Sequence, residues 1–140
     1  MKNWYYFIFG LIGVFSAITH TMDGLTTELP ALSSSNIEYI RQAIFAFNYH
    51  IVAADHLGVG IALIVMAFQK NMAIIKSAAW VIMAILFARA VVSLITVFSV
   101  LNDSGNAGTF WIPAVFNTIG VLLLWLGTRV SPRAAAASPP

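Results

Sequence analysis

Four long apolar runs, separated by shorter polar connections, constrain this chain more than any other feature. The runs cover residues 4–21, 46–68, 72–98 and 111–127. A helix needs about 20 consecutive apolar residues to cross a bilayer. Because lipid offers the backbone no hydrogen-bond partner, such a run has to be helical there. The sequence therefore predicts an all-α integral membrane protein, a bundle of four transmembrane helices.

Composition excludes most other classes of protein. The 140 residues are 60% hydrophobic and 9% charged, whereas a soluble domain carries about 25% charged residues. The chain has no cysteine, which excludes disulfides, thiolate metal sites and cysteine nucleophiles. Its net charge of +2 is scattered along the chain, so nucleic acid is not expected as a partner. Residues 1–130 are predicted to form one transmembrane domain, and residues 131–140 a disordered cytoplasmic tail.

The connections between the runs differ in length. The first, residues 22–44, contains Ser35 and Glu38 at the spacing of a capping box. We expect a helix from Asn36 that either lies in the membrane interface or runs straight into the second span. The short connection 69–71 predicts a tight antiparallel hairpin, and residues 101–109 form a polar turn. The first run lacks a clean cleavage site and is expected to stay in the protein rather than be removed as a signal peptide.

Orientation follows from the distribution of cations, because cytoplasmic connections are enriched in Lys and Arg. One side of the predicted topology holds Lys2, Lys70, Lys76, Arg129 and Arg133. The other side holds Asp23, Glu28, Glu38 and Asp103, with Arg41 as its one cation. Both termini are therefore predicted to face the cytoplasm, and a bacterial inner membrane is the expected location.

Polar residues inside the spans are the candidate functional residues, because ionisable groups are costly in lipid and mark function there. The candidate catalytic residues are His20, Asp55, His56 and Arg89, and the candidate substrate-binding residues are Asp23, Asn48, Ser93 and Asn117. His50 also lies in the second span, and whether it belongs to the site is left open. At 1.5 Å per residue, Asp55 is about 14 Å and Asn117 about 9 Å from the outer end of its span. The polar groups are thus expected to share the outer half of the bilayer.

Two features of the second span have distinct expected roles. Asp55 is expected to pair with Arg89 of the third span, since the two have matching depth and an unpaired charge is costly in lipid. With His56, Asp55 forms a predicted acid–base pair. The stripe of Ala54, Gly58 and Ala62 is expected to let a neighbouring helix approach closely.

The expected function is acid–base chemistry on a small lipophilic substrate: isomerisation, cyclisation or hydration. This chemistry requires no metal or cofactor, and Arg89 is expected to hold Asp55 ionised or to stabilise an oxyanion. One alternative is a haem-b-bearing membrane subunit or haem-dependent isomerase, with His20, His50 or His56 as axial ligand. Another is a small proton-coupled transporter that carries its proton on Asp55 and assembles as a homo-oligomer.

Overall fold

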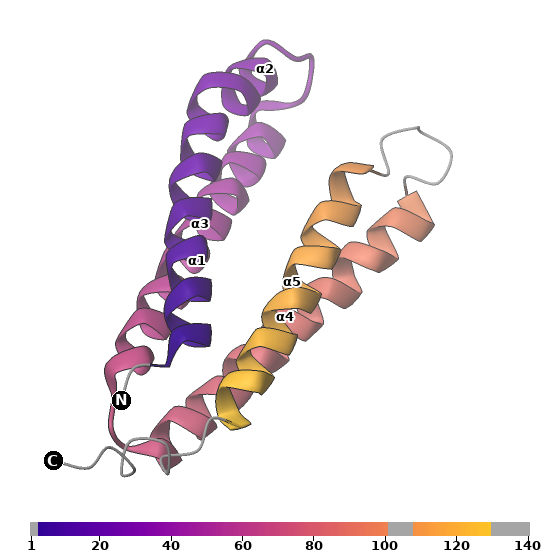
Figure 1. Ribbon diagram of the computed structural model, residues 1–140. Helices are drawn as coiled ribbons and strands as arrows, with labels where there is room; N and C mark the ends of the chain where they lie inside the picture. The colour runs from indigo at the N-terminus through magenta and orange to yellow at the C-terminus, as the bar shows by residue number, and fades with distance from the viewer. Residues whose placement is uncertain (1–2, 101–107, 130–140) are drawn as a thin grey trace, which may run out of the picture. The chain divides into compact units, whose positions relative to one another are not determined.

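The computed structural model describes residues 3–100 and 108–129, and every regular element among them is helical (Figure 1). The elements are α1 (Trp4–Asp23), the π-helical turn η1 (Gly24–Glu28), α2 (Leu29–Ser33), α3 (Tyr39–Phe68), α4 (Met72–Val100) and α5 (Gly108–Arg129). Four helical stretches are long and apolar enough to cross a membrane: Trp4–Ser33, Tyr39–Phe68, Met72–Ser99 and Trp111–Arg129. The prediction of four membrane-spanning helices is therefore confirmed. The predicted tail and most of the third connection lie outside the described residues.

The helices form two units. The first hairpin (Phe7–Val65) contains most of α1 and α3 with η1 and α2 between them, and the second contains α4 and α5 together with the chain's first residues. Large apolar side chains are exposed on all four long helices, among them Phe15, Phe47, Phe87 and Ile112. Such outward apolar faces are what helices surrounded by lipid present.

Small residues bring α1 and α3 together along one line, which we call the seam: Gly10, Gly13 and Ala17 of α1 with Ala53 and Gly60 of α3. A Cβ atom on Gly60 would lie 2.7 Å from the Val14 nitrogen and 2.8 Å from the Gly10 oxygen. The two backbones are therefore in direct contact, as small residues allow in membranes.

The predicted stripe of small residues does not make this contact. Nothing lies within 4 Å of a Cβ placed on Gly58. Ala54 and Ala62, on the same stripe, are exposed. Gly60 follows Gly58 by two residues, which is more than half a helical turn, so the seam lies on a different face of α3.

The first span continues further than its apolar run. The helical stretch that begins with α1 continues through η1 and α2 to Ser33, and Pro30 lies in the first turn of α2. A proline ring clashes with the carbonyl four residues earlier, and a π-helical turn immediately before it widens the spiral. Within this turn the Leu29 N–H donates to the Gly24 oxygen. The connection between the first two spans is therefore residues 34–38 alone.

Helix α3 begins at Tyr39 and runs uninterrupted to Phe68. The Ser35 hydroxyl donates to the backbone oxygen of Leu32 at 2.6 Å. The backbone oxygen of Glu38 accepts from the N–H groups of Arg41 and Gln42. The expected capping box at Ser35 is therefore wrong, because Glu38 itself occupies the position before the helix. The helix expected from Asn36 begins at Tyr39 instead and is continuous with the second span.

Helix α4 begins with a side-chain cap. The Asn71 Oδ1 atom accepts from the N–H groups of Ala73 at 3.1 Å and Ile74 at 3.3 Å. These two donors have no partner inside the helix, and an Asn before the first turn supplies one.

The N-terminal residues bind the second hairpin. The Asn3 side-chain amide donates to the Gly127 oxygen at 2.9 Å, and the Asn3 N–H donates to the Ala67 oxygen at 3.0 Å. The fully buried Tyr6 ring covers Gly127, where a Cβ atom would meet it. These contacts hold together the start of α1, the end of α3 and the end of α5. We call this group of residues, Asn3 and Tyr6 with Ala67 and Gly127, the N-terminal clasp.

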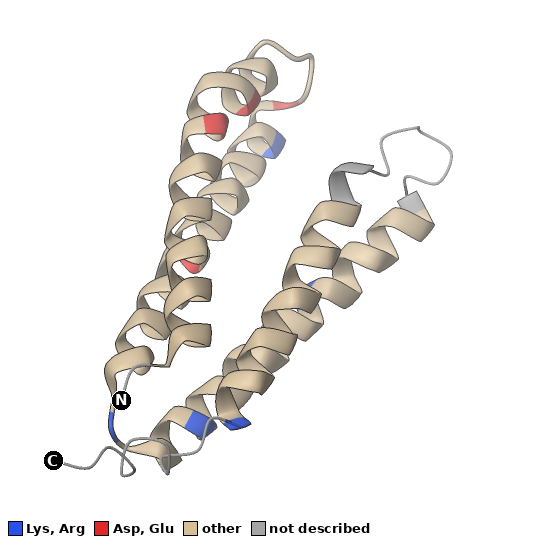
Figure 2. Cartoon of the chain, in the orientation of Figure 1, with Lys and Arg blue, Asp and Glu red and all other residues tan. Residues whose placement is uncertain are grey.

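Charges gather at one end of each hairpin (Figure 2). In the first hairpin Asp23, Glu28 and Glu38 lie at the end that holds η1 and α2, where Glu38 pairs with Arg41 at 3.8 Å. In the second hairpin the cations Lys70, Lys76 and Arg129 lie at the end that holds the N-terminal clasp. Arg129 also packs over the Trp125 ring, 4.4 Å from its centroid.

Candidate functional site

Tyr49 is the centre of a polar cluster between α1 and α3. Its ring stacks on the His20 imidazole, with centroids 4.0 Å apart and planes 10° from parallel. Its hydroxyl contacts two acceptors, the His20 backbone oxygen at 3.2 Å and the Asp23 Oδ2 atom at 3.3 Å. One α3 side chain therefore fixes the ring and backbone of His20 and reaches a carboxylate one turn further along α1.

The π-helical turn makes room for this tyrosine. A Cβ atom on Gly24, the first residue of η1, would lie 2.8 Å from the Tyr49 Cδ1 atom and 3.1 Å from its Cζ atom. Gly24 is the one buried residue of η1. The missing side chain of Gly24 therefore sets how closely the Tyr49 ring approaches α1.

His56 lies next to the cluster, with its ring centroid 6.3 Å from that of His20. Its Nδ1 atom is 2.7 Å from the Val52 backbone oxygen. A carbonyl oxygen has lone pairs but no hydrogen, so the Nδ1 atom must be the donor. In a neutral ring the Nε2 atom of His56 then carries the lone pair.

His20 has an unsatisfied nitrogen beside this second imidazole. Its Nε2 atom is buried and has no hydrogen-bond partner. A buried polar atom without a partner is rare in native proteins and calls for an explanation, such as a ligand. The cluster of His20, Asp23, Tyr49 and His56 is therefore the candidate functional site of the first hairpin.

Two predicted site residues of the second span lie away from this cluster. At about 100° per residue, Asp55 is about 200° round α3 from the seam residue Ala53, and Asn48 is about 140° from it. Asn48 is exposed and Asp55 half-buried. The structure thus turns His56 toward α1, where its ring lies 6.3 Å from that of His20, while Asp55 lies on a different face of α3 from the seam.

Asp55 lies near the middle of helix α3. Helix α3 has 30 residues from Tyr39 to Phe68, so it is roughly 45 Å long, against about 30 Å for the hydrocarbon core. Asp55 is 16 residues from its start and 13 from its end. It therefore lies near the middle of the helix rather than in its outer part.

The remaining predicted residues belong to the second hairpin. Asn117 is buried, with 6% of its surface exposed; its side-chain amide donates to the Pro113 oxygen at 2.8 Å, and its Oδ1 atom has no partner. Arg89 and Ser93 are half-buried and one turn apart on α4. Asp55 and Arg89 lie in separate hairpins, each of which the structure describes by itself, so their pairing stays a prediction.

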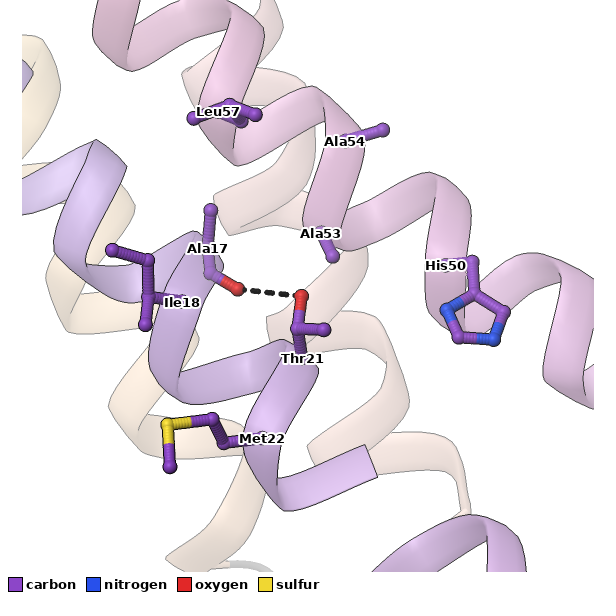
Figure 3. Close-up of a pocket in the computed structure, with 8 residues that line it drawn as sticks. All are labelled: Ala17, Ile18, Thr21, Met22, His50, Ala53, Ala54 and Leu57. Atoms are coloured by element: carbon purple, nitrogen blue, oxygen red, sulfur yellow. Dashed lines mark hydrogen bonds between the residues drawn. The ribbon is translucent and has the colours of Figure 1, made fainter. Parts of the chain in front are cut away.

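A groove of about 390 Å³ runs between α1 and α3 (Figure 3). Its lining is Ala17, Ile18, Thr21, Met22, His50, Ala53, Ala54 and Leu57. The Thr21 hydroxyl is satisfied by the Ala17 oxygen at 2.8 Å, which leaves His50 as the titratable group. His50 precedes Ala53 by three residues and His56 follows it by three, so the groove and the cluster occupy opposite flanks of the seam.

A second apolar groove, of about 580 Å³, lies between α4 and α5. Its lining is Trp80, Met83, Ala84, Phe87, Thr118, Val121, Leu122 and Trp125. The Thr118 hydroxyl donates to its own helix, to the Ala114 oxygen. The lining of this groove is therefore mainly apolar, with no titratable side chain among its residues.

A metal centre of three or more ligands is not formed within residues 3–100 and 108–129. No group of three or more His, Cys, Asp or Glu side chains there is placed to hold a metal ion.

Sequence reasoning missed Tyr49, the residue on which the cluster depends. The available signal was its spacing: Tyr49 precedes His56 by seven residues, two helical turns, so both face the same neighbour. No family model, curated protein or solved structure matches the chain. Its function is therefore inferred from the arrangement of its own residues.

Proposed function

We propose that the chain is a membrane-embedded enzyme that carries out acid–base chemistry on a small lipophilic substrate at the cluster of His20, Tyr49 and His56. The observation that carries the proposal is the buried His20 Nε2 atom, which lacks a partner beside a second imidazole. Leaving such an atom unbonded costs about 1–3 kcal/mol. A substrate that bonds to it recovers that energy.

Each residue of the cluster has a distinct proposed part. The two imidazoles take and give the proton, which histidine does most often among side chains. Tyr49 and Asp23 position His20 through the ring stack and the hydroxyl contacts. Because the helices are apolar enough to cross a membrane, a substrate dissolved in the bilayer reaches them from the side. Isomerisation, cyclisation and hydration are the reaction types that this acid–base pair serves.

A second function is favoured by the position of Asp55. Its place near the middle of α3 is where a carrier site is expected, near the bilayer midplane. In that case Asp55 carries a proton, and a homo-oligomer of the chain encloses the pathway. Proton uptake by proteoliposomes that hold a pH-sensitive dye, compared between wild type and Asp55→Asn, tests this function.

A haem fits the cluster less well than a substrate does. His20 and His56 are the candidate axial ligands, and a porphyrin bound by both would lie between their rings. Tyr49 already stacks at 4.0 Å on His20, and the seam closes the adjacent space with backbone contacts. A porphyrin ring would have to displace the Tyr49 ring and separate the backbones at the seam. A Soret band in the purified protein would favour the haem alternative.

We also propose that both termini face the cytoplasm of a bacterial cell. The N-terminal clasp fastens the start of α1 to the end of α5, at the end of the second hairpin where Lys70, Lys76 and Arg129 lie. Clustered cations mark the cytoplasmic side. A reporter fused after residue 140 is expected to be active only in the cytoplasm, and activity of a periplasm-dependent reporter there would contradict the orientation.

The enzyme proposal is tested on the purified protein in nanodiscs supplied with a lipid extract of the producing cells. We expect wild type to convert one lipophile to a product that mass spectrometry resolves, either of equal mass or heavier by one water. His20→Leu and Tyr49→Phe should abolish or weaken that conversion. His50→Leu, on the other flank of the seam, is the matched control and should leave it intact. Conversion that survives His20→Leu would contradict the assignment.

A further inference from the structure

The hydrogen-bonding state of His56 limits what the cluster can bind. Because the Nδ1 hydrogen of His56 is committed to the Val52 oxygen at 2.7 Å, the neutral ring offers its Nε2 atom as an acceptor. A ligand at this nitrogen must therefore supply a hydrogen. Ketones, ethers and hydrocarbons have none to give to a lone pair.

The His20 ring adds a second requirement. The buried Nε2 atom of His20 has no partner, and it is a donor in one tautomer and an acceptor in the other. A ligand group that both donates and accepts hydrogen bonds can satisfy either tautomer. Two hydrogen bonds of about 2.8 Å to one hydroxyl oxygen, at a roughly tetrahedral angle, span about 4.6 Å between the nitrogens. Two rings whose centroids are 6.3 Å apart reach that separation when both Nε2 atoms face the ligand.

The charges nearby exclude an anionic group. Asp23 contacts the Tyr49 hydroxyl, and Glu28 and Glu38 lie at the same end of the hairpin, where Arg41 pairs with Glu38. An anionic group at the cluster would be repelled by these carboxylates. A neutral group that both donates and accepts through one oxygen atom is a hydroxyl.

We infer that His20 and His56 bind the hydroxyl group of a lipophilic alcohol, whose hydrocarbon part remains in the apolar surroundings of α1 and α3. The inference rests on the proposed function and specifies its substrate class. Among the proposed reactions it favours hydration, in which an alcohol is formed, and the isomerisation or cyclisation of a substrate that carries a hydroxyl.

Three matched photoactivatable probes test this inference: a diazirine-bearing hexadecanol, its methyl ether and the corresponding hexadecane. Each is added to the full-length protein in phosphatidylcholine nanodiscs, and the labelled peptides are identified by mass spectrometry. We expect the alcohol to label peptides around residues 17–24 and 49–56 about three- to tenfold more than the ether, which is the range that one hydrogen bond gives. Equal labelling by alcohol and ether would overturn the inference.

Variants separate binding from folding. His56→Leu should remove the preference for the alcohol, whereas His56→Gln, whose amide oxygen still accepts, should keep part of it. His50→Leu, on the groove flank, should change nothing. An alcohol preference that persists in His56→Leu would overturn the assignment, as would its loss in His50→Leu.

Nitrogen NMR of the protein labelled with ¹⁵N-histidine gives a readout that needs neither ligand nor turnover. The signals of the three histidines are assigned by the variants. His56 should carry its hydrogen on Nδ1, and a hydrogen on Nε2 would overturn the inference. Alcohol binding without any conversion of lipids would overturn the proposed enzyme and leave this site standing, so the two failures are distinguishable.

Discussion

Two glycines on the same helix make opposite predictions for the same substitution. Gly60 lies in the seam, where a Cβ atom would approach the Val14 nitrogen to 2.7 Å and the Gly10 oxygen to 2.8 Å. Gly58 lies two residues earlier with nothing within 4 Å of its Cβ position. Gly60→Ala and Gly58→Ala therefore add the same methyl group to the same helix, two residues apart. They differ in that only the methyl group at residue 60 meets α1.

The expected magnitudes follow from two opposing effects. Alanine in place of glycine inside a helix stabilises it by about 0.5–1 kcal/mol, and Gly58→Ala should gain that amount. At Gly60 the atoms met are backbone, which cannot rotate away, so the helices must separate at an overpacking cost of about 1–3 kcal/mol. The two variants should therefore differ by about 1–3 kcal/mol, with Gly60→Ala the less stable.

Denaturation by sodium dodecyl sulfate in mixed micelles measures the difference as a shift of the unfolding midpoint. The chain has no cysteine, so a cysteine pair introduced at the seam residues Ala17 and Ala53 reports the contact of α1 with α3 separately, through its rate of disulfide formation. Gly60→Ala should lower the midpoint and slow that rate, and Gly58→Ala should do neither. Equal behaviour of the two variants would refute the seam and the placement of His20 against α3.

Three further outcomes follow from other contacts. Gly24→Ala should displace the Tyr49 ring and sharply reduce lipid conversion in the nanodisc assay while moving the unfolding midpoint little; unchanged conversion would contradict the positioning of Tyr49. Asn71→Ala should cost about 0.5–2 kcal/mol through loss of the α4 cap, and Asn71→Asp, which still accepts, should restore most of it in the same denaturation assay. The predicted pairing of Asp55 with Arg89 implies that Asp55→Asn and Arg89→Gln each destabilise the protein, because each leaves one charge uncompensated, and that the double variant loses less than their sum; additive losses would show that the residues do not meet.

The fold was largely predictable because its strongest determinant, apolar length, is local in sequence. Each of the four apolar runs forms part of a helix long enough to cross a membrane. The ends of the helices were not predictable from that pattern. Proline commonly breaks a helix, but Pro30 lies in the first turn of α2, directly after the π-helical turn, and the helical stretch continues to Ser33. Polar helical residues such as Arg41 likewise extend α3 beyond its apolar run.

The candidate site was predictable in its residue types but not in its partners. His20, Asp23 and His56 stand out in the sequence because polar groups are rare in spans. Which of them meet depends on the face of α3 that packs against α1, and the seam at Gly60, not the stripe at Gly58, decides that face. Tyr49 was missed because a tyrosine in an apolar run resembles an ordinary packing residue.

Deuterium incorporation tests the central claim, proton transfer to a lipophile, most directly. The purified protein in nanodiscs is incubated with the cellular lipid extract in D₂O, and the lipids are compared by mass spectrometry after exchangeable hydrogens are returned to H₂O. Wild type should introduce carbon-bound deuterium into one lipophile, because the proton that a histidine delivers comes from solvent. His20→Leu should abolish that incorporation, and His50→Leu should retain it. Wild-type protein that leaves every lipophile free of carbon-bound deuterium would contradict the account.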